Sequence, residues 1–411
     1  MDLRSKLQLY KESANRAALT RPQRGERDID VIVPGAVLEN EHGTCYVIEN
    51  KYPLSYLYGG CSIGNALGIG EDIVAMLGGA GCKAVRSEKL LYLDTETTGL
   101  SGGAGTVAFL VGTGFFENGA FVVRQYFMRD YDEEAAMLRE LQQLFAGCGG
   151  FVTFNGKAFD INLLQSRFIS NRFKPFFKDL PNVDLLYPAR RTWGLKLESC
   201  RLVSLEENIL GETRIGDIPG ELIPAVYFKY LDDRDATEIR RVVKHNEQDI
   251  LSMVSLLCKL AAMVGSPISE TDGCLELLGV SRLFEANGRI DDMLECLEAL
   301  TASEHFNVRM HAVKRLTRVY KRNGRYDRAL EHWKAVEAEN PGFECFHLVE
   351  LAKYYEHKVR DYNMALRATN KAMESCIRAG FAGGRQLEEL KRRKARLIKK
   401  LGRSGAMGCE S

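Results

Sequence analysis

The chain has 411 residues and a formal net charge of +1 at pH 7, with 45% hydrophobic and 27% charged residues. At roughly 100–200 residues per domain, this length predicts two or three globular domains of ordinary composition. The balanced charge excludes a basic surface that covers the whole chain, so any surface that attracts nucleic acid must be local.

Residues 1–30 are predicted to form a charged amphipathic helix followed by a basic stretch. This segment has no apolar core of signal-peptide length. No run of about 18 apolar residues indicates a membrane span. The eleven cysteines lack CxxC pairs and are interpreted as free thiols in a reducing compartment. We therefore expect a cytoplasmic protein with no membrane partner.

Residues 1–87 are predicted to be an N-terminal extension that packs on the domain that follows it. Its clearest element is a strand in "TCYVIENKYPL", residues 44–54. The glycine-rich residues 59–79 mix turns with a short helix. No function follows from this segment.

Residues 88–262 are predicted to form one α/β domain. Strands at 89–97, 105–116 and 120–128 precede a helix at 132–147, a strand at 149–156 and a helix at 159–170. Asn118 and Gly119 separate two apolar runs, and both tolerate the positive φ of a type I′ hairpin turn. The order of elements resembles the ribonuclease H-like fold, a mixed sheet flanked by helices.

Residues 263–275 combine Gly, Ser, Pro and Asp and are predicted to be a linker. Residues 276–411 are predicted to be all-helical, because similar segments recur 36 residues apart. Gly288 aligns with Gly324, and Met293, Ala329 and Ala365 align with one another. This period resembles tetratricopeptide repeats. The residues of the middle copy that match that pattern are Tyr320, Gly324, Tyr326, Ala329, Trp333 and Pro341. A basic helix at the C-terminus is interpreted as the cap.

Asp94 and Glu96 lie two residues apart on the first strand of the α/β domain, so both side chains point to one face. Two neighbouring carboxylates repel each other and lose solvation on a central strand, and divalent cations relieve both costs. Asp160 follows a second apolar strand and a glycine turn. His245 and Asp249 are spaced i, i+4 and share one face of a helix.

These segments resemble the three motifs of the DEDD 3′–5′ exonuclease superfamily, and most closely its YprB-like ribonuclease H-like branch. "LDTETTGL", "FNGKAFD" and "HNEQD" are similar to the first, second and third motifs. The resemblance implies that two Mg²⁺ or Mn²⁺ ions clamp the attacking and leaving oxygens of a phosphodiester. It implies Asp94, Glu96, Asp160 and Asp249 as catalytic metal ligands.

The resemblance also implies His245 as the catalytic group that accepts the proton of the attacking water. In the superfamily a histidine usually precedes the last aspartate by five positions, and a tyrosine precedes it by four. His245 stands at the tyrosine spacing, which leaves open whether its imidazole reaches the water. The residues expected to contact sugar and phosphate are Thr97, Asn155, Lys157, Arg190 and Arg191.

Two side chains near these motifs have alternative interpretations. Asn155 either touches the substrate or caps the turn before Asp160. Asp184 either caps the start of a helix or supports the metal ligands.

Two hypotheses from different classes remain after the sequence analysis. The first is a metal-dependent hydrolase of RNA or single-stranded DNA, with end-trimming or internal cleavage left open. The second is an adaptor whose nuclease-like domain holds nucleic acid without cleaving it. Under both hypotheses the helical repeats are expected to bind a protein partner in their concave groove.

Overall fold

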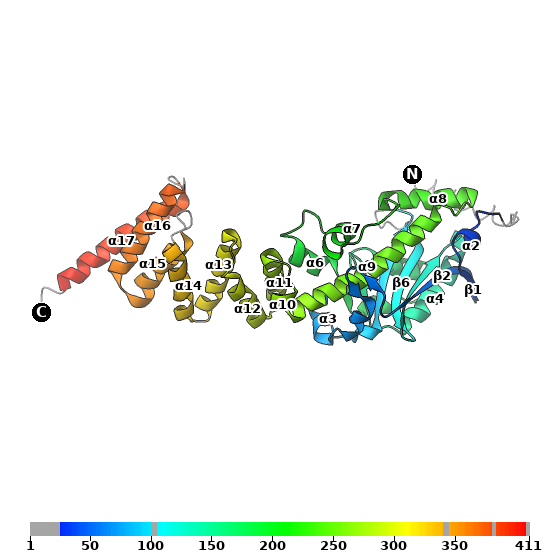
Figure 1. Ribbon diagram of the computed structural model, residues 1–411, viewed down its shortest axis with the longest axis horizontal. Helices are drawn as coiled ribbons and strands as arrows, with labels where there is room; N and C mark the ends of the chain where they lie inside the picture. Colours follow the sequence, from blue (N-terminus) through cyan, green and yellow to red (C-terminus); the bar gives the residue numbers. More distant parts are fainter. Residues whose placement is uncertain (1–24, 100–104, 340–344, 380–383, 408–411) are drawn as a thin grey trace. The chain divides into compact units, whose positions relative to one another are not determined.

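A computed structural model describes residues 25–99, 105–339, 345–379 and 384–407. It divides into two compact units, Met1–Ile290 and Asp291–Ser411, which we call the N-terminal and C-terminal units (Figure 1). Most of the helix predicted within residues 1–30 lies outside the described residues, as does Pro341 of the repeat pattern.

The N-terminal unit is built on a seven-stranded mixed sheet in the order β1-β2-β7-β6-β5-β8-β9. The strands are β1 (Ala36–Asn40), β2 (Gly43–Pro53), β5 (Leu90–Thr97), β6 (Ala108–Glu117), β7 (Ala120–Phe127), β8 (Gly150–Thr153) and β9 (Asn182–Asp184). β8 runs parallel to both β5 and β9, and the other pairs are antiparallel. β3 (Leu57–Tyr58) and β4 (Cys61–Ser62) form a small separate sheet. The predicted mixed sheet is confirmed.

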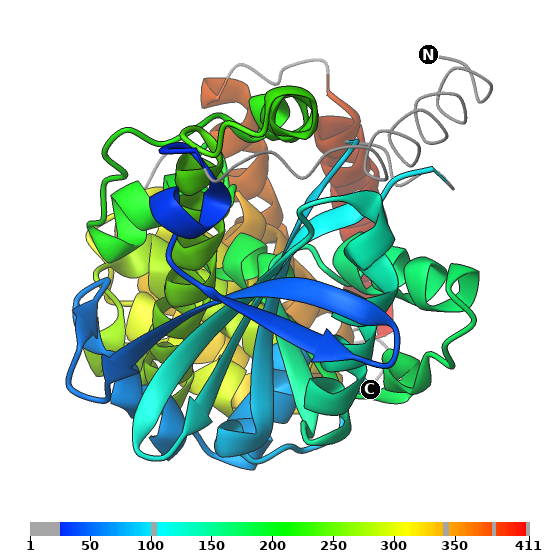
Figure 2. The ribbon, with the colours of Figure 1, turned by 90° about the vertical axis from the view of Figure 1, so that its right-hand side faces the viewer.

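Local backbone chemistry accounts for the hairpin between β6 and β7. Asn118 has φ 51° and Gly119 has φ 75°, the positive values that a type I′ turn requires. β2 pairs along the whole of β7. Figure 2 shows the blue N-terminal strands alongside the cyan ones. The described part of the N-terminal extension thus enlarges the sheet.

Helices cover both faces of this sheet. The described helices of the N-terminal unit are α2 (Ile29–Ile32), α3 (Glu71–Gly78), α4 (Glu134–Ala146), α5 (Asp160–Ser170), α6 (Leu186–Trp193), α7 (Leu202–Leu205), α8 (Ile223–Asp233), α9 (Ile239–Gly265), α10 (Pro267–Glu270) and α11 (Cys274–Ala286). α4 and α5 pack on the face that carries Phe151, where Phe145 meets its ring edge-on at 5.2 Å. α9 packs on β5, β6 and β7. Because side chains alternate along β5, Asp94 and Glu96 face α9 while Leu91 and Leu93 face α4 and α5.

α9 is the one described helix that is long and apolar enough, by length and composition, to cross a membrane. In its most apolar 18-residue window, 72% of the residues are buried inside the fold. Packing against the sheet accounts for that apolar composition.

The boundary between the two units differs from the predicted linker. Residues 263–275 hold the end of α9, all of α10 and the start of α11. α11 packs against α6 so closely that a Cβ on Gly279 would lie 2.1 Å from the carbonyl oxygen of Thr192. The turn-forming residues lie in a short connection inside the N-terminal unit. The boundary between the two units falls after Ile290, beyond the predicted linker.

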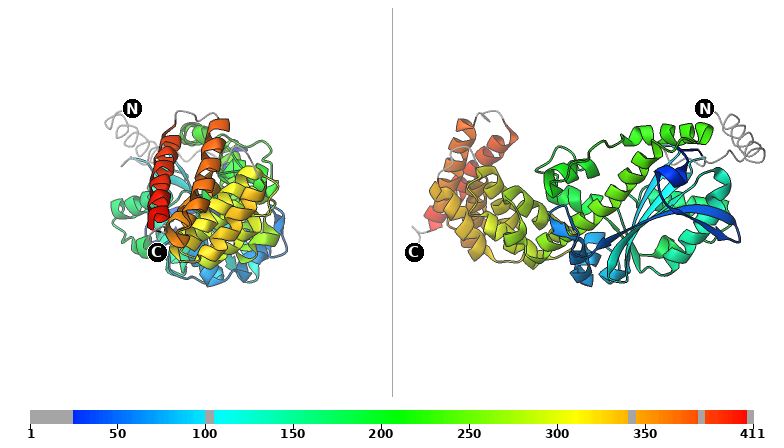
Figure 3. Two further views of the ribbon diagram at one scale, coloured as in Figure 1. Left: turned by 90° about the vertical axis from the view of Figure 1, so that its left-hand side faces the viewer. Right: turned by 45° about the vertical axis from the view of Figure 1, so that its right-hand side comes forward.

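The described part of the C-terminal unit is helical. Its helices are α12 (Ile290–Leu300), α13 (Phe306–Arg322), α14 (Tyr326–Glu339), α15 (Phe346–Tyr354), a π-helical turn η7 (Tyr355–Val359), α16 (Tyr362–Arg378) and α17 (Arg385–Met407). From α13 onwards each helix packs on the next, and Figure 3 shows them stacked in chain order from yellow to red. Gly288 and Gly324, 36 residues apart, have φ values of 72° and 74°. An all-helical region after the mixed sheet is confirmed.

Candidate metal and active site

Asp94 on β5 lies opposite Gly112 on β6, under helix α9. A Cβ at Gly112 would lie 2.1 Å from Oδ1 of Asn246, so only glycine lets α9 approach the sheet here. Asn246 is fully buried, and its Nδ2 donates a hydrogen bond of 2.8 Å to Asp94 Oδ2. Gln125 in turn donates to Asn246 Oδ1 at 2.8 Å. This chain of amides fixes the position of the Asp94 carboxylate.

Glu96, His245 and Asp249 bring their side chains together between β5 and α9. One potential ligand atom from each lies within 4.8 Å of the others. His245 Nε2 is 3.9 Å from Glu96 Oε1 and 3.7 Å from Asp249 Oδ2. The three side chains can therefore face one metal ion.

Glu96 is the carboxylate of this cluster whose charge is least compensated. It is 9% exposed, and its buried Oε1 has no hydrogen-bond partner. Burial raises the pKa of Glu96 to about 8; the charge of His245 opposes that rise, and the charges of Asp249 and Asp160 add to it. A buried oxygen without a donor, among other acids, fits a hard divalent cation.

Asp160 reaches the end of β5 from the first position of α5. Thr95 Oγ1 donates to its carboxylate. Burial raises the pKa of Asp160 to about 6, although that hydrogen bond opposes the rise. Burial, followed by the charges of Asp249, Glu96 and Asp160, also raises the pKa of Asp94 well above its usual value. The charges of the four predicted acids therefore influence one another in one region of the fold.

The turn before Asp160 is held by Asp184, at the end of β9. Asp184 accepts hydrogen bonds from the backbone N–H groups of Asn155 at 2.7 Å and Lys157 at 3.0 Å. It also accepts a longer bond from Leu186 at the start of α6. Asn155 has φ 65° and lies in this turn in a left-handed conformation.

The sequence analysis missed three side chains that are linked to the predicted site by hydrogen bonds: Arg214, Glu206 and Asp217. Glu206 is fully buried, and Arg214 grips it with Nε at 2.6 Å and Nη2 at 2.5 Å. The same Nη2 also donates to Asp249. Arg214 thus orients one predicted metal ligand while it balances a buried carboxylate. No local pattern signals this, because Arg214 lies in an irregular segment 35 residues from Asp249.

Asp217 determines how His245 is oriented. Its Oδ1 lies 2.8 Å from His245 Nδ1, while Arg214 Nη1 lies 3.1 Å from the same nitrogen. A carboxylate only accepts, so the shorter contact assigns the proton to Nδ1 and leaves the Nε2 lone pair facing Glu96 and Asp249. Burial lowers the pKa of His245, but the neighbouring carboxylates outweigh burial and raise it overall.

The residues predicted to contact substrate do not all lie at the acid cluster. Thr97 is buried, and its hydroxyl donates to the Gly99 carbonyl at 2.9 Å. Lys157 is exposed, and its ammonium donates to the Gly78 carbonyl at 2.9 Å. Arg190 and Arg191 are exposed in the last turn of α6, outside the acid cluster.

These features define a ribonuclease H-like domain with an acidic cluster that can hold metal. Residues 91–261 match the family model described as the RNase_H superfamily. The chain is also 29% identical over 372 residues to a protein of Bacillus subtilis (strain 168) that carries the name "Uncharacterized protein YprB". That similarity covers 89% of this chain and 87% of the Bacillus protein. It therefore extends over both units.

Proposed function

We propose that this protein is a metal-dependent nuclease that hydrolyses phosphodiester bonds of RNA or single-stranded DNA, in the 3′–5′ exonucleolytic direction. The observation that carries the proposal is the buried Oε1 of Glu96, which has no hydrogen-bond partner and faces His245 and Asp249. A buried carboxylate oxygen that has no donor and lies among other acids is poorly suited to a metal-free structural role. It suits a site that receives cations.

Asp94, Glu96, Asp160 and Asp249 would hold two Mg²⁺ or Mn²⁺ ions. When bound, such ions stabilise the charge that develops on the transferring phosphoryl group. His245 Nε2 would accept the proton of the attacking water instead of binding a metal ion, since Asp217 contacts the other ring nitrogen and Nε2 faces the acids. Asn246 and Arg214 hold Asp94 and Asp249 in place.

The C-terminal unit is proposed to be a tetratricopeptide-like array that binds a protein partner. Two features support this. Gly324 adopts a left-handed conformation at the position of the repeat glycine. Ala329, Trp333 and Ala365 are buried at the aligned small or aromatic positions. We propose a cytoplasmic location for the whole protein.

Labelled single-stranded and duplex RNA and DNA, incubated with full-length protein and Mn²⁺, Mg²⁺ or EDTA, test the proposal. We expect metal-dependent ladders that shorten from the 3′ end. Asp94→Asn and Asp160→Asn should each abolish them, since each removes a charge from the metal site. The matched control is Asp132→Asn, which changes an exposed acid near the start of α4.

The outcome also separates the nuclease from the adaptor. Strand binding without any metal-dependent product would support the adaptor. Normal turnover in both site variants, with contaminating nuclease excluded, would show that these acids do not form the catalytic site.

A further inference from the structure

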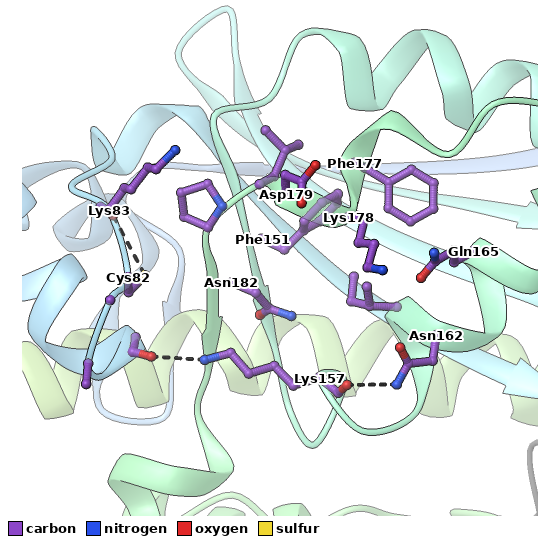
Figure 4. A pocket seen from close by; sticks show the side chains of 16 residues that line it. Cys82, Lys83, Phe151, Lys157, Asn162, Gln165, Phe177, Lys178, Asp179 and Asn182 are labelled. Carbon is purple, nitrogen blue, oxygen red and sulfur yellow. Dashed lines mark hydrogen bonds between the residues drawn. The ribbon is translucent and has the colours of Figure 1, made fainter.

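A cavity of about 390 Å³ lies beside α5, between the end of α3, the 3₁₀ turn η4 (Phe176–Asp179) and the start of β9 (Figure 4). Its volume is at the lower end of the range for small-molecule sites, roughly 300–1,000 Å³. Neither the acid cluster nor the proposed chemistry assigns it a role.

The cavity is separate from the acid cluster, although the two share a helix. Ile161, Asn162 and Gln165 of α5 line it, whereas Asp160 points toward Thr95 and β5. At about 100° per residue, those three positions lie roughly 100–200° around the helix from Asp160. A ligand in the cavity therefore contacts the opposite face of the helix that starts with Asp160.

The charge of the lining favours an anion. Lys83, Lys157 and Lys178 line the cavity, against one acid, Asp179. Figure 4 shows the amine of Lys178 and the amide of Gln165 around the same space, with Asn182 across from them.

Asn182 supplies an independent sign of a missing ligand. Its Oδ1 accepts a hydrogen bond of 3.0 Å from Thr153 Oγ1. Its Nδ2 is buried and has no hydrogen-bond partner. A buried donor without a partner costs roughly 1–3 kcal/mol, and an acceptor brought by a ligand removes that cost.

We infer that this cavity binds a nucleoside 5′-monophosphate. Lys178 and the Asn182 amide receive the phosphate, and the apolar atoms of Ile161, Leu180 and Pro181 lie along the nucleoside. The choice of a nucleoside as the apolar part rests on the proposed function, because a 3′–5′ exonuclease releases such products. The recognition of phosphate rests on the lining alone.

Binding is measured by calorimetric titration of the full-length protein in EDTA, where hydrolysis is suppressed. The titrants are a nucleoside monophosphate, the matching nucleoside and inorganic phosphate. We expect saturable binding of the monophosphate and at least about tenfold weaker binding of the other two, since each lacks one set of contacts. Lys178→Glu should weaken monophosphate binding by about tenfold or more, because it turns an attracting charge into a repelling one. Lys174→Glu, an exposed lysine four residues earlier that does not line the cavity, should have no effect.

Each other outcome overturns the inference. Equal binding of inorganic phosphate would make this a simple anion site, and equal binding of the nucleoside would remove the role of the lysines. Absence of binding, or equal losses in the Lys178 and Lys174 variants, would show that the cavity is not the site. Because hydrolysis is assayed separately with Mg²⁺ or Mn²⁺, failure of the nuclease proposal appears in the product ladders and failure of this inference in the EDTA titration.

Discussion

Replacing Glu96 with glutamine should make the metal-free protein more stable at alkaline pH. The substitution keeps the shape of the side chain and removes its charge. Burial is the main reason why the pKa of Glu96 rises from 4.5 to about 8. One pKa unit corresponds to about 1.36 kcal/mol, so the ionised carboxylate destabilises the folded state by about 5 kcal/mol.

The sign of the pH dependence follows from proton binding. Below pH 4.5 the carboxyl group is protonated in both states and contributes nothing. Between pH 4.5 and about 8 the unfolded state releases the proton while the folded state keeps it, so wild-type stability falls as pH rises. Above about pH 8 the loss is complete. Glutamine places a polar amide atom at the position of Glu96 Oε1, which has no partner, and this costs roughly 1–3 kcal/mol at every pH. The variant should therefore be equal or weaker at pH 5 and stronger by a few kcal/mol at pH 9.

Urea unfolding in EDTA at pH 5, 7 and 9 measures this difference. The chain has two tryptophans, so Trp333→Phe leaves buried Trp193 of α6 as a fluorescence probe of the N-terminal unit. Glu39→Gln, at an exposed position of β1, is the control and should show no pH-dependent gain. Mn²⁺ should stabilise wild type more than Glu96→Gln. An advantage of Glu96→Gln that stays constant or shrinks from pH 5 to pH 9 would refute the reasoning.

Three further predictions concern other charged side chains. His245→Ala should slow single-turnover hydrolysis roughly 10²–10⁴-fold with little change in substrate affinity; full recovery at saturating Mg²⁺ would contradict its role as the base. Asp217→Ala should slow hydrolysis less than His245→Ala does, and it should have no additional effect in the His245→Ala background. A double-mutant cycle of single-turnover rates measures this coupling. Additive losses would contradict the orienting role of Asp217. Glu356→Gln should destabilise the C-terminal unit by about 3–5 kcal/mol at pH 7 in chemical unfolding, because three cations surround this buried carboxylate. Burial opposes ionisation of Glu356, but those cations lower its pKa to about 2. The stabilisation by the ionised Glu356 should therefore disappear as pH falls from 4.5 toward 2. A stability difference between wild type and Glu356→Gln that stays constant across that range would contradict an electrostatic origin.

The features that the sequence predicted well depend on short-range geometry. The Asn118-Gly119 turn requires only that two adjacent residues accept positive φ. Asp94 and Glu96 share a face because side chains alternate along any strand. His245 and Asp249 share a face because they are one helical turn apart. None of these conclusions needs knowledge of the tertiary structure.

The features that were missed depend on chain segments that meet only after folding. Arg214 and Asp217 lie in the irregular segment between the π-helical turn η5 (Glu206–Leu210) and α8. No periodicity there indicates a direction for either side chain. The linker prediction differed from the structure for a related reason. Gly, Ser and Pro indicate a turn, but they do not reveal that α11 buries Leu277, Val280 and Leu283 after that turn.

The hydrogen bonds of the four acids also indicate where a first cation would be attracted. Asp94 accepts from Asn246, Asp160 from Thr95, and Asp249 from Arg214. Each of these carboxylates therefore has one oxygen stabilised by the protein itself. Glu96 Oε1 has no such donor.

Arg214 also forms an ion pair with the fully buried Glu206, which fixes the position of its guanidinium group. The guanidinium therefore neutralises part of the charge of Asp249. Glu96 Oε1 is thus the acid oxygen that the protein's own donors stabilise least. We therefore expect the first divalent ion to bind at Glu96. Its affinity should fall more in Glu96→Gln than in Asp249→Asn, which metal titration of both variants measures. The reverse order would show that the charge of Arg214 does not control metal binding.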